Sequence, residues 1–204
     1  SLIWKVVSLR GAWPEVAKEL WDWTQLANRL IEVDSLRLGV LVLEMIYSGT
    51  MISHEDSEES HLLMECTRRN AVEMWEKIGE KLLSKSWRVE LVIRGWLLSV
   101  VPVSVVESWI DDDIERARLV ASIAPIGGNE PSEIVRLLLT CFGTDVEVGG
   151  NLAGTFISGA WIGNESDRIA GQIDQLAQWR QSDVEPPAVK QWAKKMIDSL
   201  QNAK

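Results

Sequence analysis

Apolar residues recur at helical spacing along almost the whole chain. The first set advances in steps of three or four residues, through Val16, Leu20, Trp23, Ala27 and Leu30. Residues 36–47 are apolar on nearly every side, which is typical of a helix packed between other helices. Further helical spacing covers residues 71–82 and 89–100, and in the second of these it outweighs the strand preference of the valines. The pattern therefore predicts helices, and no segment alternates convincingly with the period of a strand.

The second half of the chain has clearer helix boundaries. The acidic run 111–113 precedes one apolar set as an N-cap and first-turn pattern, and Asn164 can cap another helix. Gly143 follows the helix expected over 132–142, and Pro186-Pro187 begins the last helix. Short links of this kind join antiparallel neighbours, so we predict an all-α fold of about eight to ten helices.

Stacked antiparallel helical hairpins are the most economical arrangement, because the apolar sets recur without any jump in length. No segment rich in proline, glycine or serine divides the chain, so we expect one helical domain over residues 1–204. Residues 48–60 form the loosest segment and are expected to be a mobile surface loop. The sequence begins without methionine and is already apolar at residue 2, so we expect it to be a piece of a longer protein.

A resemblance to a known repeat family is carried by residues 158–167, continuing through Trp179 to the run AVKQWA at 188–193. This stretch resembles a HEAT or armadillo-type helical repeat, and Asp111–Ser122 is a weaker match to the same pattern. The resemblance covers about residues 111–204 and implies an α-solenoid. Similar arrays occur as sensor or scaffold regions of large bacterial NTPase-type and defence proteins, which is an analogy of fold alone.

Charge and composition narrow the function classes. The net charge is −9, with a pI near 4.8, which argues against a binder of nucleic-acid phosphates. The longest apolar runs are shorter than the roughly 20 residues of a membrane span, so we expect a cytoplasmic protein without membrane contact. Two cysteines and two histidines leave little material for a disulfide scaffold, a metal site or a nucleophile–histidine pair.

Each feature that could carry chemistry has a simpler structural interpretation. The histidines His54 and His61 flank an acidic segment at a spacing that matches no familiar metal site. The cysteines are expected to pack as small hydrophobes in helical stripes. Gly150 and Gly154 lack the motif of a phosphate loop and are expected to let a neighbouring helix approach closely. We therefore predict no enzyme activity and no cofactor.

Tryptophan is the unusual residue, with 11 copies in 204 residues. Five of them fall in apolar stripes, where core packing is the expected role: Trp23, Trp75, Trp96, Trp179 and Trp192. Two others lie off the main stripe and are candidate hot spots for a partner, as are four acidic residues of the loose segment. This predicted partner-binding set is Trp13, Trp21, Glu55, Asp56, Glu58 and Glu59.

These features favour a protein-interaction module, either a scaffold or a sensor, within a larger bacterial protein such as a defence or signalling NTPase. Its partner would carry a basic or mixed face, or would be the rest of its own longer chain. One alternative is a stand-alone helical regulator or immunity-type inhibitor that blocks a basic site. A helical-repeat nucleic-acid-binding enzyme is a third interpretation, which the acidity of both halves of the chain disfavours.

Overall fold

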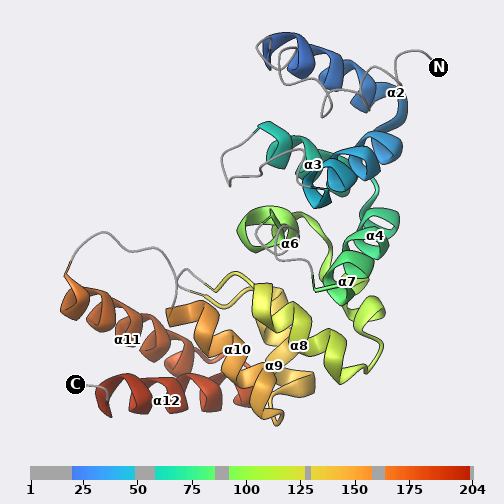
Figure 1. Ribbon diagram of the computed structural model, residues 1–204. Coiled ribbons are helices and arrows are strands. Elements are labelled where there is room, and N and C mark those ends of the chain that lie inside the picture. Colours follow the sequence, from blue (N-terminus) through green and yellow to red (C-terminus); the bar gives the residue numbers. More distant parts are fainter. Residues whose placement is uncertain (1–19, 49–57, 86–91, 127–129, 158–163, 203–204) are drawn as a thin grey trace. The chain divides into compact units, whose positions relative to one another are not determined.

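The computed structural model describes the chain outside residues 1–19, 49–57, 86–91, 127–129, 158–163 and 203–204, and gives the backbone alone for residues 20–26 and 58. The described residues form ten α-helices and one π-helix and contain no strand (Figure 1). The all-α fold predicted from the hydrophobic spacing is therefore confirmed. The chain divides into two compact units, Ser1–Trp109 and Ile110–Lys204. The single domain expected from the sequence stays a prediction.

The first unit contains α2, α3, α4, the π-helix η3, α6 and most of α7. Their bounds are Leu20–Tyr47, Glu58–Arg69, Ala71–Leu83, Ile93–Leu97, Leu98–Val100 and Val103–Ile110. Helix α2 is broken at Asp34, whose backbone is extended and whose carboxylate accepts a 3.0 Å hydrogen bond from the Arg37 amide. An aspartate in this position caps the following helix, so α2 consists of the two helices that the spacing predicts.

Two glycines allow the helices of the first unit to pack closely. A Cβ on Gly39 of α2 would lie 2.7 Å from Cβ of Cys66 in α3 and 2.8 Å from Sδ of Met74 in α4. A Cβ on Gly79 of α4 would lie 2.5 Å from Nε1 of Trp109 in α7. Because real Cβ atoms do not come so close to a neighbour, both positions require glycine.

The segment expected as a fourth helix is helical where it is described, but its centre is wound as the π-helix η3. Val101 is extended and precedes Pro102, so the chain turns there before α7. Within the described ranges, no individual helix has both the length and the apolar composition of a membrane span. Two consecutive helical segments, Ile93–Val100 and Val103–Ile110, meet those criteria only when they are counted together, and the chain bends by 107° between them.

The second unit contains α8, α9, α10, α11 and α12, with bounds Ile114–Ile123, Glu133–Phe142, Val146–Ile157, Glu165–Gln181 and Pro187–Asn202. Its caps agree with the sequence. Asp113 accepts hydrogen bonds from two amides in the first turn of α8, and Asn164 accepts one from the Ser166 amide in α11. Pro187 is the first residue of α12. The preceding residues Asp111 and Asp112 have positive φ angles of 46° and 59°.

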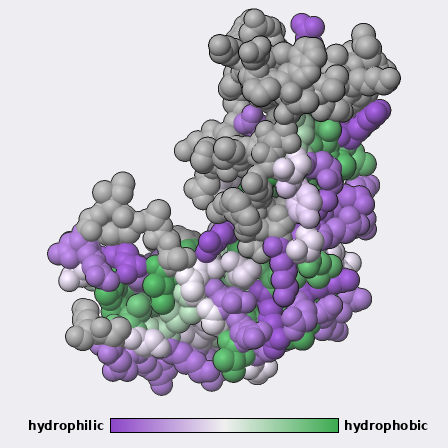
Figure 2. Space-filling model, viewed as in Figure 1, coloured by the Kyte–Doolittle hydropathy of each residue, from purple (hydrophilic) through white to green (hydrophobic). Residues whose placement is uncertain are grey.

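Packing in the second unit centres on two helix pairs. Helices α11 and α12 form an antiparallel hairpin, and α8 packs along α10 (Figure 1). Phe156 of α10, Trp179 of α11 and Trp192 of α12 share one aromatic cluster, with ring centroids 6.2–6.3 Å apart. Hydrophilic surface covers the outer side of α12, where Lys194 and Lys195 are exposed (Figure 2).

A buried ion pair fastens α9 to the turn between α11 and α12. The guanidinium of Arg136 donates two hydrogen bonds to the carboxylate of Glu185, at 2.9 and 2.6 Å. The Glu185 side chain is 1% exposed, whereas that of Glu130, which lies 3.5 Å from the same guanidinium, is 79% exposed. Since a buried carboxylate is costly without a partner, this pair fixes the position of the turn.

Three sequence expectations are wrong. Gly150 and Gly154 do not receive a neighbouring helix of the described chain, because a Cβ on either would meet no atom within 4 Å. Cys141 is exposed rather than packed in the core, because it lies on the outer side of α9. The expected loop over residues 48–60 ends early, since α3 already begins at Glu58.

Candidate functional site

The predicted partner-binding residues lie mostly outside the described part of the chain. Trp13, Glu55 and Asp56 are not described, and Trp21 and Glu58 lie on α2 and α3 without described side chains. Glu59 is half-buried in the first turn of α3 and takes part in an interaction. The structure therefore leaves the predicted set untested, and among its acidic members it places Glu58 and Glu59 at the start of α3.

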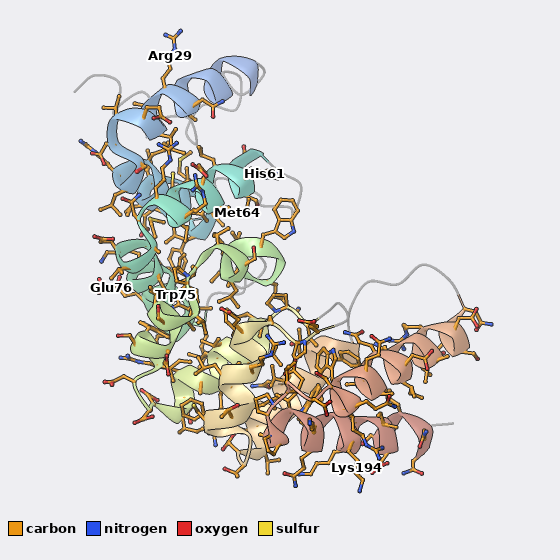
Figure 3. All side chains as sticks on the ribbon, turned by 180° about the vertical axis from the view of Figure 1, so that it is seen from behind. Arg29, His61, Met64, Trp75, Glu76 and Lys194 are labelled. Carbon is orange, nitrogen blue, oxygen red and sulfur yellow. The ribbon has the colours of Figure 1, made fainter. Side chains whose placement is uncertain are left out.

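Two residues after Glu59, an exposed histidine meets a half-buried tryptophan. The rings of His61 on α3 and Trp96 on η3 pack edge to face, with centroids 4.7 Å apart and planes inclined by 65°. Figure 3 shows His61 and Met64 on α3. The side chain of His61 is exposed, and that of Met64 is half-buried. We call the pair of His61 and Trp96 the aromatic corner.

Trp96 lies within the π-helix η3. In η3 the backbone makes i→i+5 hydrogen bonds, so the side chains are rotated from the positions they would have in an α-helix. Ile93 and Leu97 remain buried at its two ends, and Trp96 between them is left half-exposed. The Ser99 hydroxyl donates a 2.6 Å hydrogen bond to the Trp96 carbonyl, which satisfies an acceptor of the wider turn. Helical spacing predicted Trp96 as a core residue, and its side chain is half-buried rather than fully buried.

The other described tryptophans in apolar stripes are buried, as expected. Trp75 of α4 is fully buried and packs edge to face against Trp109, with centroids 5.8 Å apart (Figure 3). Trp179 and Trp192 are 1% and 7% exposed. Trp23 lies on α2 without a described side chain. Among the tryptophans of the apolar stripes whose side chains are described, Trp96 is thus the one that is partly exposed.

Further along α3, Arg68 and Arg69 are held by carboxylates. On α3, Glu65 accepts hydrogen bonds from Arg68 at 2.6 and 2.8 Å and from Arg69 at 2.8 Å, and Arg69 also bonds Glu32 of α2 at 2.7 Å. The hydrogen bonds from Arg68, and then those from Arg69, lower the pKa of Glu65 to about 2. These charges therefore form a surface network in which the positive groups are already neutralised.

The second unit has a similar network around Arg118. This guanidinium contacts Asp145 at 2.7 Å, Glu115 at 2.6 Å and Glu147 at 2.9 Å. Hydrogen bonds from Arg118, followed by the backbone amide of Val148, lower the pKa of Asp145 to about 2. Arg136 is likewise paired, with Glu185, so both of these cations have acidic neighbours.

The described residues contain no group of three or more histidine, cysteine or acidic side chains that could hold a metal ion. His54 lies outside the described residues. Cys66 is buried, and the loss of hydration raises the pKa of its thiol to about 12, so little of the reactive thiolate forms at neutral pH.

Comparison with protein-family profiles, with curated proteins and with solved structures finds no match to this chain. The HEAT or armadillo resemblance of residues 111–204 therefore stays a hypothesis beyond the all-helical architecture.

Proposed function

We propose that the chain is a protein-interaction module built from stacked helical hairpins of the HEAT or armadillo type. In this proposal it is a scaffold or sensor region of a larger bacterial protein, such as a cytoplasmic defence or signalling NTPase, and it performs no catalysis itself. The observation that supports this function is the aromatic corner, where the large ring of Trp96 reaches the surface beside the exposed His61.

A half-exposed tryptophan can contribute much of the binding free energy of an interface. Its ring has a large apolar area and few rotatable bonds, so its burial by a partner gains hydrophobic free energy at a small entropic cost. The edge-to-face packing on His61 already restrains the ring. Binding therefore requires little further ordering of this side chain.

Charge supports specificity for the partner. Acidic residues immediately precede α3, and the first turn of α3 includes Glu58 and Glu59. A partner with a basic or mixed face would be attracted by them, and this attraction raises the rate of association more than the lifetime of the complex. Replacement of Glu55, Asp56, Glu58 and Glu59 by serine is expected to slow association at low salt.

The test is capture of partners from the source cells with the Trp96→Ala chain. We expect at least one protein bound by the unmodified chain to bind the variant more weakly, by about 2 kcal/mol or roughly thirtyfold in affinity. Tyr47→Ala is the matched control, because Tyr47 is an exposed aromatic elsewhere on the same unit. Trp96→Phe, which keeps an aromatic ring against His61, should retain part of the binding. Identical capture by all chains would contradict the role of the aromatic corner.

The acidic composition also favours one alternative, a stand-alone regulator or immunity-type inhibitor that blocks a basic site on its target. The size of the endogenous polypeptide discriminates between the two. A polypeptide much larger than 22.9 kDa supports the module, and one near 22.9 kDa supports the regulator.

A further inference from the structure

One member of the aromatic corner can change its charge near neutral pH. Histidine is the side chain that ordinarily gains or loses a proton between about pH 5 and 8. The imidazole of His61 is exposed on α3, so protons reach it from solvent (Figure 3). Its ring centroid lies 4.7 Å from that of Trp96. Protonation of His61 therefore places a positive charge directly beside the indole.

The two charge states of the imidazole interact differently with the indole. The neutral ring forms an aromatic pair with Trp96, and the 65° between the ring planes is the favoured edge-to-face arrangement. The protonated ring carries an N–H donor on both nitrogens and a full positive charge. A cation within about 6 Å of an indole centroid is attracted by the negative charge of the ring face. Protonation therefore converts the aromatic pair into a cation–π pair.

The other charged groups of the corner keep their charge in this pH range. They are Glu58, Glu59, Glu65, Arg68 and Arg69 on α3 and Arg94 on η3, while α6 has no charged residue. Glu65 is held by Arg68 and Arg69, and Glu59 and Arg94 each take part in an interaction. Carboxylates and guanidinium groups ordinarily stay ionised between about pH 5.5 and 8. On these elements, His61 is therefore the residue expected to respond to pH in that range.

A positive charge at the corner opposes the kind of partner that the chain is proposed to bind. Acidic residues at the start of α3 would attract a basic or mixed face. An imidazolium beside Trp96 repels such a face. It also competes with any cation of the partner for the negative face of the indole. Neutral His61 presents neither obstacle.

We propose that protonation of His61 regulates the aromatic corner, so that the neutral pair docks a basic partner and the charged pair docks it more weakly, below about pH 6. This inference rests on the proposed partner-binding function and adds the regulation of the same site. The step is the uptake of one proton from solvent by the unprotonated ring nitrogen of His61, and release of that proton reverses it.

The pair itself is tested without any partner, by NMR of the indole N–H groups of the full chain between about pH 5.5 and 8. Trp96→Phe identifies the Trp96 signal, because that signal disappears in this variant. We expect the signal to follow a single-proton titration in the unmodified chain and to lose it in His61→Gln. His54→Gln is the matched control, since it removes the other histidine of the sequence and should leave the titration intact. A Trp96 signal that does not move with pH, or that moves equally in His61→Gln, would overturn the proposal.

The regulation is tested with the proteins that the unmodified chain captures and Trp96→Ala does not. Their affinity for the unmodified chain and for His54→Gln should fall about threefold between about pH 7.5 and 6, and their affinity for His61→Gln should not fall. An equal fall in His61→Gln would overturn the regulation and leave the proposed function standing. Absence of any Trp96-dependent protein would contradict the proposed function and its regulation together, even where the NMR titration is present.

Discussion

The two units use helix glycines in opposite ways. In the first unit, Gly39 and Gly79 lie where helices touch, and a methyl group at either position would overlap Cys66, Met74 or Trp109. In the second unit, Gly150 and Gly154 face open space. The comparison shows that a glycine within a helix indicates close packing of a neighbouring helix only when a side chain of that neighbour lies against it. Adding a methyl group should therefore destabilise the fold at the packed glycines and stabilise it at the open ones.

The units also differ in how their ion pairs are placed. Around Glu65 in the first unit, the paired side chains are between 32% and 67% exposed. In the second unit, the Glu185 carboxylate is almost fully buried against Arg136. Exposed pairs contribute little to stability, whereas removal of one partner from a buried pair leaves a charge without compensation.

The largest expected effect is that of Glu185→Ala. It leaves Arg136 without its main partner, and it should lower the free energy of unfolding by about 3 kcal/mol. Denaturant titration measures the loss. Glu130→Ala, which removes the exposed carboxylate near the same guanidinium, should change stability by less than about 0.5 kcal/mol. Equal effects of the two changes would contradict the contrast between buried and exposed pairs.

A somewhat smaller loss is expected for Gly79→Ala. The added methyl group would press against the indole of Trp109, and overpacking of this kind costs about 2 kcal/mol. Thermal unfolding monitored by circular dichroism provides the measurement. Unchanged stability would show that Trp109 moves aside freely. The close packing of α4 against α7 would then not require glycine at position 79.

The opposite sign is expected for Gly171→Ala in the second unit. Its Cβ meets no atom within 4 Å, so the helix gains from the better propensity of alanine, by about 0.5–1 kcal/mol. The same unfolding experiment reports it. A loss of stability here would mean that the open glycines of the second unit resemble those of the first.

The smallest expected effects are pH-dependent. Because the pKa values of Glu65 and Asp145 are lowered to about 2, their pairs stabilise the folded chain above the ordinary carboxyl pKa near 4. That contribution is lost as the pH falls from about 4 to 2. Glu65→Gln and Asp145→Asn should each flatten the acid limb of the stability curve. An acid limb unchanged in both variants would contradict these ion pairs.

Much of the helical architecture could be predicted from the sequence. Apolar spacing locates the helices, and Asp113, Asn164 and Pro187 mark the starts of three of them, because capping and proline preferences act locally. The break at Asp34 separates the two helices that the spacing predicts.

The contacts between helices could not be predicted in the same way. Trp96 has the spacing of a core residue, but it lies within the π-helix η3 and its side chain is only half-buried. The contact of Gly79 depends on Trp109, which lies 30 positions further along the chain. Such pairings depend on tertiary packing, about which a single sequence contains no direct information.

The central claim is that each unit exposes an apolar surface, at Trp96 and His61 in the first unit and at Val146 and Ile157 in the second. Hydroxyl-radical footprinting of the full chain, at low and high protein concentration, tests it most directly. We predict that Trp96 and His61 are oxidised at both concentrations while Trp75 is protected at both. Val146 and Ile157, which are exposed on α10, should be oxidised at both concentrations as well. Protection of Val146 and Ile157 at both concentrations, or protection of Trp96 as complete as that of Trp75, would contradict the account.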